Sequence, residues 1–194
     1  EGFNRHMRVS VASAMAVGVT ADAEYADVEL TNNICQPEFF DKLKAVLPAG
    51  MKLLRAKEIT SGRHQSMNAL VDTALYEMKF PDDITADELQ ATIDQFNAAP
   101  TLIFVREKQG KGAKKGRIIK KEIDIKQFLA SALTAGEADN VVLAAIKVSS
   151  LGSIKPIEII NALKINYLPT LDSNAVLINR KTLSAGGKNL MDLI

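Results

Sequence analysis

The chain has 194 residues, with 24 Lys and Arg against 23 Asp and Glu, 47% hydrophobic residues, no Trp and one Cys. A chain of this length can bury about 70% of the surface that it exposes when unfolded, so it can build a hydrophobic core without a metal or a disulfide. The single Cys35 excludes an internal disulfide, a four-cysteine iron–sulfur site and a zinc ribbon, and it favours a reducing, cytoplasmic location.

Periodicity in the first sixty residues predicts the order strand, strand, helix, strand. Residues 7–13 and 24–31 alternate apolar and polar side chains with the period of a strand, and we expect 16–23 to be a connection between them. Behind Pro37, which suits a first helical position, five apolar residues recur at helical spacing: Phe39, Phe40, Leu43, Val46 and Leu47. Residues 51–60 predict one more strand. This order is that of a ferredoxin-like βαββαβ unit without its first strand and helix.

A second α+β unit is expected over residues 69–194, after a polar linker at 61–68. Its first predicted strand covers 69–80. Thr85 and Glu88 then form a capping box, in which each side chain satisfies a backbone amide that has no helical partner. We therefore expect a helix to begin at this point.

Further strands and a helix complete the second unit. Residues 101–108 and 117–125 flank a glycine-rich stretch as the two arms of a hairpin. After a short helical piece around Phe128, the almost wholly apolar run 141–148 is typical of an internal strand buried on both faces. Pro156 opens the next helix.

The last predicted strand covers 175–183, and we expect the tail after it to be loose until Leu190. Together the elements predict an α+β fold with two ferredoxin-like units, whose antiparallel sheets are covered by helices. The first unit, residues 1–60, lacks its initial strand and helix, and the second carries a basic hairpin at 106–121.

Positive charge is concentrated in that hairpin. Eight of the 24 basic residues of the chain fall within its sixteen positions: Arg106, Lys108, Lys111, Lys114, Lys115, Arg117, Lys120 and Lys121. Glu107 is the one acidic residue among them, so the segment has a net charge of +7, whereas the whole chain has +1 and the remainder therefore −6. The near-neutral total conceals a basic hairpin on a mildly acidic body.

A polyanion, most plausibly RNA, is the expected partner of this hairpin. Each Lys or Arg that neutralises a phosphate releases a counterion, so about four contacts give a log–log salt slope of roughly −3 on a single strand. The segment has no aromatic residue for base stacking, no RNP motif and no P-loop spacing. The alternative interpretation is that its lysines only solubilise an exposed hairpin and discourage edge pairing.

The opening residues offer a second candidate site. Four side chains suited to proton transfer or anion binding lie together before the first strand: Glu1, Asn4, Arg5 and His6. His6 titrates near neutral pH and Glu1 can orient it, so the two are candidates for a general acid–base pair. Arg5 or Arg8 would then hold an anionic substrate. The alternative is an ordinary turn that leads into the strand, with Gly2 and Asn4 supplying its geometry.

The sequence predicts neither a metal site nor a membrane partner. Its two histidines, His6 and His64, form no H-x-x-x-H pair, and no Cys/His cluster or carboxylate array has metal-ligand spacing. The longest apolar runs, such as 141–146, are about six residues long, against about 20 for a membrane-spanning helix. The first residues have no initiator Met and no signal-peptide features, so we expect the chain to begin inside a larger protein.

The opening motif also resembles that of a known family. EGFN with His6, then AVGV and an acidic E-Y-x-D-x-E-L strand, resembles the signature of an uncharacterised domain linked to radical S-adenosylmethionine (radical SAM) proteins. The residues that carry the resemblance are Glu1, Gly2, Phe3, Asn4, His6, the stretch 16–19, Glu24, Tyr25, Asp27, Glu29 and Leu30. The later segment 152–163 also looks like the family, whereas Arg5 and Met7 stand where its members have prolines.

The resemblance implies that a strand and an Arg-rich helix precede EGFN, so that this chain is truncated at its N-terminus. It also implies a radical SAM protein, fused or separate, that carries the iron–sulfur cluster and S-adenosylmethionine, with no cofactor on this chain. Our leading hypothesis is an accessory, non-catalytic module that positions a substrate, most plausibly RNA, for that partner. The alternatives are a catalytic domain that uses Glu1 and His6, and a protein-docking domain with an exposed apolar patch on one sheet.

Overall fold

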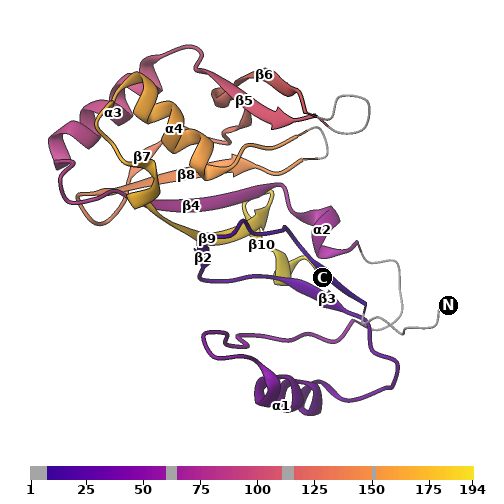
Figure 1. The fold of residues 1–194 in the computed structure, drawn as a ribbon. Helices are drawn as coiled ribbons and strands as arrows, with labels where there is room; N and C mark the ends of the chain where they lie inside the picture. The colour runs from indigo at the N-terminus through magenta and orange to yellow at the C-terminus, as the bar shows by residue number, and fades with distance from the viewer. Residues whose placement is uncertain (1–7, 60–64, 111–115, 150–151) are drawn as a thin grey trace.

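A computed structural model describes residues 8–59, 65–110, 116–149 and 152–194. At its centre lies a six-stranded sheet in the order β10-β9-β4-β8-β7, with β2 also paired to β9 (Figure 1). The strands are β2 (Val19–Ala21), β4 (Thr73–Lys79), β7 (Thr134–Ala135), β8 (Val141–Lys147), β9 (Leu177–Ala185) and β10 (Lys188–Asn189). Every pair of neighbours is antiparallel except β2 with β9.

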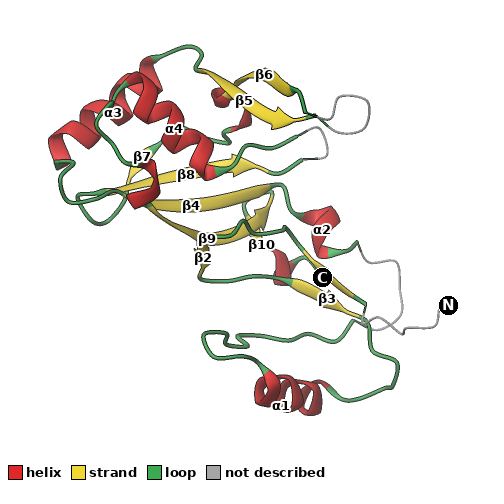
Figure 2. Ribbon diagram, viewed as in Figure 1, coloured by secondary structure: helices red, strands yellow, loops and turns green. Residues whose placement is uncertain are grey.

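One face of this sheet carries the main hydrophobic core. Alternate residues of β4 and β8 point to that face and are buried, as Met78 and Val142 are. Helices α3 (Ala86–Ala98) and α4 (Pro156–Asn166) lie on the same face, as Figure 2 shows. Buried side chains of both helices join the strand residues in one cluster. The second unit is therefore a sheet covered by helices, as predicted.

Both helices begin where the sequence predicts. At the start of α3 the hydroxyl of Thr85 accepts a hydrogen bond from the amide of Glu88 at 3.3 Å, and the Glu88 carboxylate accepts one from the amide of Thr85 at 3.0 Å. At the start of α4 the Glu158 carboxylate accepts a hydrogen bond from the amide of Lys155 at 2.8 Å. These contacts satisfy amides that no helical carbonyl can reach.

The order of elements around β4 is regular. Along the chain β4, α3, β7, β8, α4 and β9 follow as strand, helix, strand, strand, helix, strand, and the basic hairpin is inserted between α3 and β7. In the sheet the first of these strands, β4, lies between the third, β8, and the fourth, β9. A mixed α+β fold with antiparallel sheets is therefore confirmed. Within the described ranges, no helix is both long and apolar enough to cross a membrane.

The first sixty residues depart from the predicted unit. β1 (Val9–Val11) and β3 (Ala26–Val28) pair as a two-stranded sheet, and α1 (Gln36–Val46) has Pro37 in its first turn, as predicted, but buries none of its residues. The predicted strand at 51–60 is wrong over 51–59, which join no strand, and residue 60 lies outside the described residues.

The physical reason is the absence of a ladder partner. A strand needs a neighbour with which to exchange backbone hydrogen bonds, and none of the described strands lies paired to residues 51–59.

Two segments are more ordered than the sequence predicts. The expected connection at 16–23 contains β2, in which Val19 lies opposite Ile178 of β9. The tail is not loose, because β9 continues to Ala185, β10 follows, and Leu190 is fully buried in a second hydrophobic cluster. The partner of β2 is distant along the chain, and so are Ala12 and Met67, which share the cluster of Leu190, so local periodicity contains no sign of these contacts. β10 pairs instead with the adjacent end of β9.

The segment between the two predicted units is partly described. Helix α2 (Met67–Leu70) covers the end of the predicted linker at 61–68, and the Met67 side chain is buried. Residues 60–64 lie outside the described residues. The division into 1–60 and 69–194 therefore stays a prediction, although β2 ties the first part to the sheet of the second.

Candidate nucleic-acid interface

The basic segment forms the predicted hairpin. β5 (Ile103–Gln109) and β6 (Ile118–Asp124) pair antiparallel along their whole length. At the base of the hairpin the Asp124 carboxylate accepts a hydrogen bond from the amide of Leu102 at 3.0 Å, and the Ile123 side chain is buried in the main core. The hairpin is thus anchored to the body of the protein at its base.

Strand alternation divides the hairpin into two faces. Residues directly opposite one another in an antiparallel pair share a face, so the register assigns each side chain. The inner face, which turns toward the core at its base, consists of Phe104, Arg106, Lys108, Ile119, Lys121 and Ile123. The outer face consists of Ile103, Val105, Glu107, Gln109, Ile118, Lys120, Glu122 and Asp124. The inner face has three basic residues and no acidic one, whereas the outer face has three carboxylates and one lysine.

Arg117 extends the inner face. The amide of Gly110 donates a hydrogen bond to the Arg117 carbonyl at 2.8 Å, so the ladder continues beyond the two named strands. Because Arg117 lies two residues before Ile119, its side chain belongs to the same face. Of the predicted basic residues that the structure describes, only Lys120 is on the outer face, where its Nζ lies 2.9 Å from the Glu107 carboxylate.

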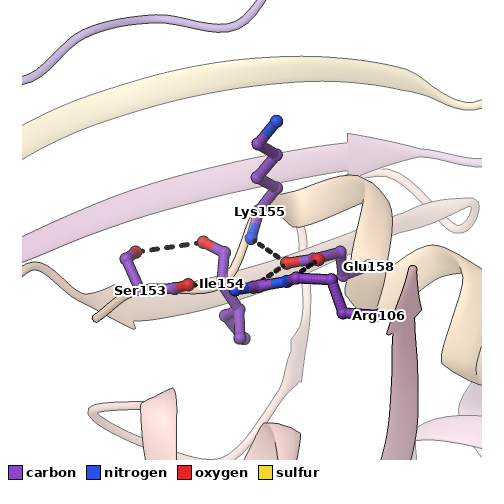
Figure 3. Close-up of polar contacts among 5 residues, drawn as sticks. All are labelled: Arg106, Ser153, Ile154, Lys155 and Glu158. Carbon is purple, nitrogen blue, oxygen red and sulfur yellow. Dashed lines mark hydrogen bonds and ion pairs between the residues drawn. The ribbon is translucent and has the colours of Figure 1, made fainter. Parts of the chain in front are cut away.

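Arg106 is held by an ion pair with α4 (Figure 3). Its Nε and Nη2 atoms donate hydrogen bonds to the two carboxylate oxygens of Glu158 at 2.5 and 2.6 Å, and Nη2 also donates to the Ser153 carbonyl at 3.0 Å. The two side chains are only 21% and 10% exposed. The hydrogen bonds to Glu158 raise the pKa of Arg106, although burial opposes them. This bidentate pair fixes β5 to the start of α4 and neutralises the guanidinium.

The other cations of the inner face are placed differently. Lys108, Arg117 and Lys121 are exposed, and no carboxylate of a described residue lies within 4.0 Å of their charged nitrogens. The predicted binding residues that the structure describes therefore separate into two that have a carboxylate partner, Arg106 and Lys120, and three that have none among the described residues. Lys111, Lys114 and Lys115 lie outside the described residues.

The structure does not describe the second candidate site. The motif residues Glu1, Gly2, Phe3, Asn4 and His6 lie outside the described residues, as does Arg5. Arg8 is described, and its guanidinium lies 3.0 Å from the Glu29 carboxylate with both side chains exposed, beside a shallow hollow that Asp27 also lines. Within the described ranges, no three His, Cys, Asp or Glu side chains are grouped as metal ligands.

Acidic residues of the family-like motif make structural contacts. The Nε atom of Arg180 on β9 donates a hydrogen bond to Glu24 at 2.7 Å, and Nη2 donates to Glu24 and to the Ser13 carbonyl. Burial disfavours the charged form of Arg180, but its hydrogen bonds to Glu24 and Tyr76 outweigh burial and raise its pKa. Sequence analysis missed this pair. Strand alternation could have indicated that Arg180 is buried, because it lies two residues after the buried Ile178, at a strand position that faces the core.

A second ion pair joins β9 to the residues after β2. The Nζ atom of Lys181 lies 2.7 Å from the Asp22 carboxylate, which also accepts a hydrogen bond from the Asn179 amide group at 2.8 Å. The Lys181 contact, followed by the Asn179 hydrogen bond, lowers the pKa of Asp22, and the pKa of Lys181 is raised by the same pairing. Both charged groups are accessible to water, so we expect a small contribution to stability.

The lowered pKa predicts how Asp22→Asn changes stability with pH. The folded-state pKa of Asp22 is below its unfolded value of about 4, so the pair stabilises the fold above that value and the stabilisation is lost as the pH falls through the folded-state pKa. We expect wild type to exceed the Asn variant in free energy of unfolding by less than about 1 kcal/mol at pH 7. The difference shrinks below about pH 4. Urea denaturation from pH 7 to 3 measures this difference, and Lys181→Gln should remove the larger part of the same pH dependence, because the Asn179 hydrogen bond remains. A difference that is unchanged at pH 3 contradicts the prediction.

These features define an α+β protein with a basic hairpin, in which the described cations without a carboxylate partner share one face. Residues 1–156 match the family DUF2344, which is described as an uncharacterized protein conserved in bacteria. Because this match covers most of the chain, the protein belongs to that family. Neither a curated protein nor a solved structure matches this chain.

Proposed function

We propose that the protein is an accessory, non-catalytic module of a cytoplasmic radical SAM system, which binds RNA and positions it for a partner enzyme. The partner carries the iron–sulfur cluster and S-adenosylmethionine. The separation of charge between the two faces of the hairpin is the observation that supports RNA binding. The single Cys35 agrees with a cluster on another protein or domain. The radical SAM link rests on the resemblance of the opening motif.

Three cations of the inner face have no carboxylate partner in the part of the chain that the structure describes. Arg106 and Lys120 each have a carboxylate partner, whereas Lys108, Arg117 and Lys121 are exposed and have none among the described residues. Three phosphate contacts give a log–log salt slope of about −2 on a single strand, and any contact from the rest of the basic segment makes it steeper. Small α+β units often present a sheet to RNA, which is support by analogy of fold.

Filter binding to tRNA and to mixed RNA at several salt concentrations tests the RNA-binding step. We expect binding at low salt that weakens with a log–log slope between about −2 and −3. Replacing Lys111, Lys114, Lys115 and Arg117 together by Ala should weaken binding by more than about 10-fold near 0.1 M salt. No binding by wild type at low salt, or undiminished binding by this variant, contradicts the proposal.

Protein docking is a second candidate function, favoured by the two-stranded sheet. Val9 lies opposite Val28 and Val11 opposite Ala26, so the four side chains share one face, and all of them are exposed. An apolar face of this kind is typical of a surface that another protein covers. The double variant Val9→Ser/Val28→Ser should then weaken association with the radical SAM partner, and undiminished association contradicts this second function.

A further inference from the structure

We propose that the inner face of the hairpin is the surface that contacts phosphates, with Lys108, Arg117 and Lys121 meeting phosphates of one RNA strand. This inference rests on the proposed function and names the surface and the chemistry of recognition. Arg106 is also on the inner face, but it holds the hairpin against α4 through Glu158 and does not contact the ligand.

The three cations form a staggered row across the two strands. Lys121 lies opposite Arg106, and Lys108 is two residues further along the same strand, so Lys121 and Lys108 are diagonal neighbours. Lys108 and Arg117 have the same relation, because Gly110 bonds to Arg117. Diagonal neighbours in an antiparallel pair are about 7 Å apart. Long basic side chains at that spacing can reach successive phosphates of a strand.

The outer face cannot take the same ligand. It contains Glu107, Glu122 and Asp124, and its one cation, Lys120, is paired with Glu107. The outer face is therefore negative, and a phosphate chain that approached it would be repelled. At 0.1 M salt the Debye length is about 10 Å, so an RNA strand on one face experiences mainly the charges of that face.

The inner face contacts the backbone of RNA without reading its bases. Its one aromatic residue, Phe104, is partly buried against the main core, and the exposed apolar residue near the cations is Ile119. No described residue of the inner face offers an exposed ring on which a base can stack. The ligand class is therefore the phosphodiester backbone, and affinity should depend on salt far more than on sequence.

Single substitutions with equal loss of charge test the assignment. Lys108→Ala and Lys121→Ala each remove one inner cation, and Lys120→Ala removes one outer cation from the same strand pair. Each inner variant should bind mixed RNA about 5-fold more weakly at 0.1 M salt, with the slope reduced in magnitude by about 0.7. The Lys120 variant should stay within about 2-fold of wild type. Circular dichroism checks that all three remain folded.

The possible results separate this inference from the proposed function. If the Lys120 variant loses as much affinity as the inner variants, the hairpin acts through its total charge, so the inner-face assignment is overturned while RNA binding stands. A preference of more than about 10-fold for one homopolymer over another overturns backbone recognition. If wild type binds no RNA at low salt, the proposed function and this inference both fail.

Discussion

Replacing Glu24 by Gln should lower the free energy of unfolding by about 3 kcal/mol, and replacing Arg180 by Met by only about 1.5 kcal/mol. The difference follows from burial, since Arg180 is 0% exposed and the Glu24 side chain is 37% exposed. The Gln variant leaves a buried guanidinium without its counter-charge. The Met variant removes that charge and leaves a carboxylate that water can hydrate. Urea denaturation at pH 7 measures both values.

Two further variants make this prediction specific. Glu29→Gln removes the partner of Arg8 in a pair that is exposed on both sides, and it should change stability by less than about 0.5 kcal/mol. The double variant of Glu24 and Arg180 should be at least as stable as Glu24→Gln alone, because no buried charge remains. If Arg180→Met is the more destabilising of the two single changes, the hydrogen bonds of Arg180 to Ser13 and Tyr76 matter more than charge balance.

The elements that the sequence predicts correctly are those whose evidence is local. The capping box of Thr85 and Glu88 marks the start of α3, Pro156 marks the start of α4, and the glycine-rich stretch between 101–108 and 117–125 marks the hairpin. The prediction at 51–59 fails because a strand also needs a neighbour. The residue pattern of a segment shows that it could form a strand, but it does not show whether another strand lies beside it. β2 escapes prediction for the converse reason, since its partner lies on β9 more than 150 residues away.

The candidate interface was predictable in composition and only partly in geometry. A count of charges locates the basic segment, and alternation along β6 would have separated Lys120 from Lys121. The pairing of Arg106 with Glu158 was not predictable, because the two residues meet only when α4 packs beside the hairpin. The same holds for Glu24, whose place in an acidic motif gives no indication of a buried arginine as its partner.

In the ion pair between the hairpin and α4, replacing the cation should cost more free energy of unfolding than replacing the anion. This is the reverse of the order expected for Arg180 and Glu24. Here the anion is the more buried partner, with Glu158 10% exposed and Arg106 21%. Arg106→Met should therefore destabilise the protein by about 3 kcal/mol, since it leaves an enclosed carboxylate without a cation, and Glu158→Gln by about 2 kcal/mol. The Gln side chain still offers an oxygen to the amide of Lys155, so the helix cap is kept.

Hydrogen exchange measured by mass spectrometry locates the effect. In both variants the amides of β5 and of the first turn of α4 should exchange faster, and those of β4 and β9 should change only as far as global stability does. Lys120→Ala, which breaks the exposed pair with Glu107, is the matched control and should leave exchange in β5 unchanged. If Glu158→Gln proves more damaging than Arg106→Met, the carboxylate acts mainly as the cap of α4. In that case, contacts other than the ion pair hold the cationic face of the hairpin in place.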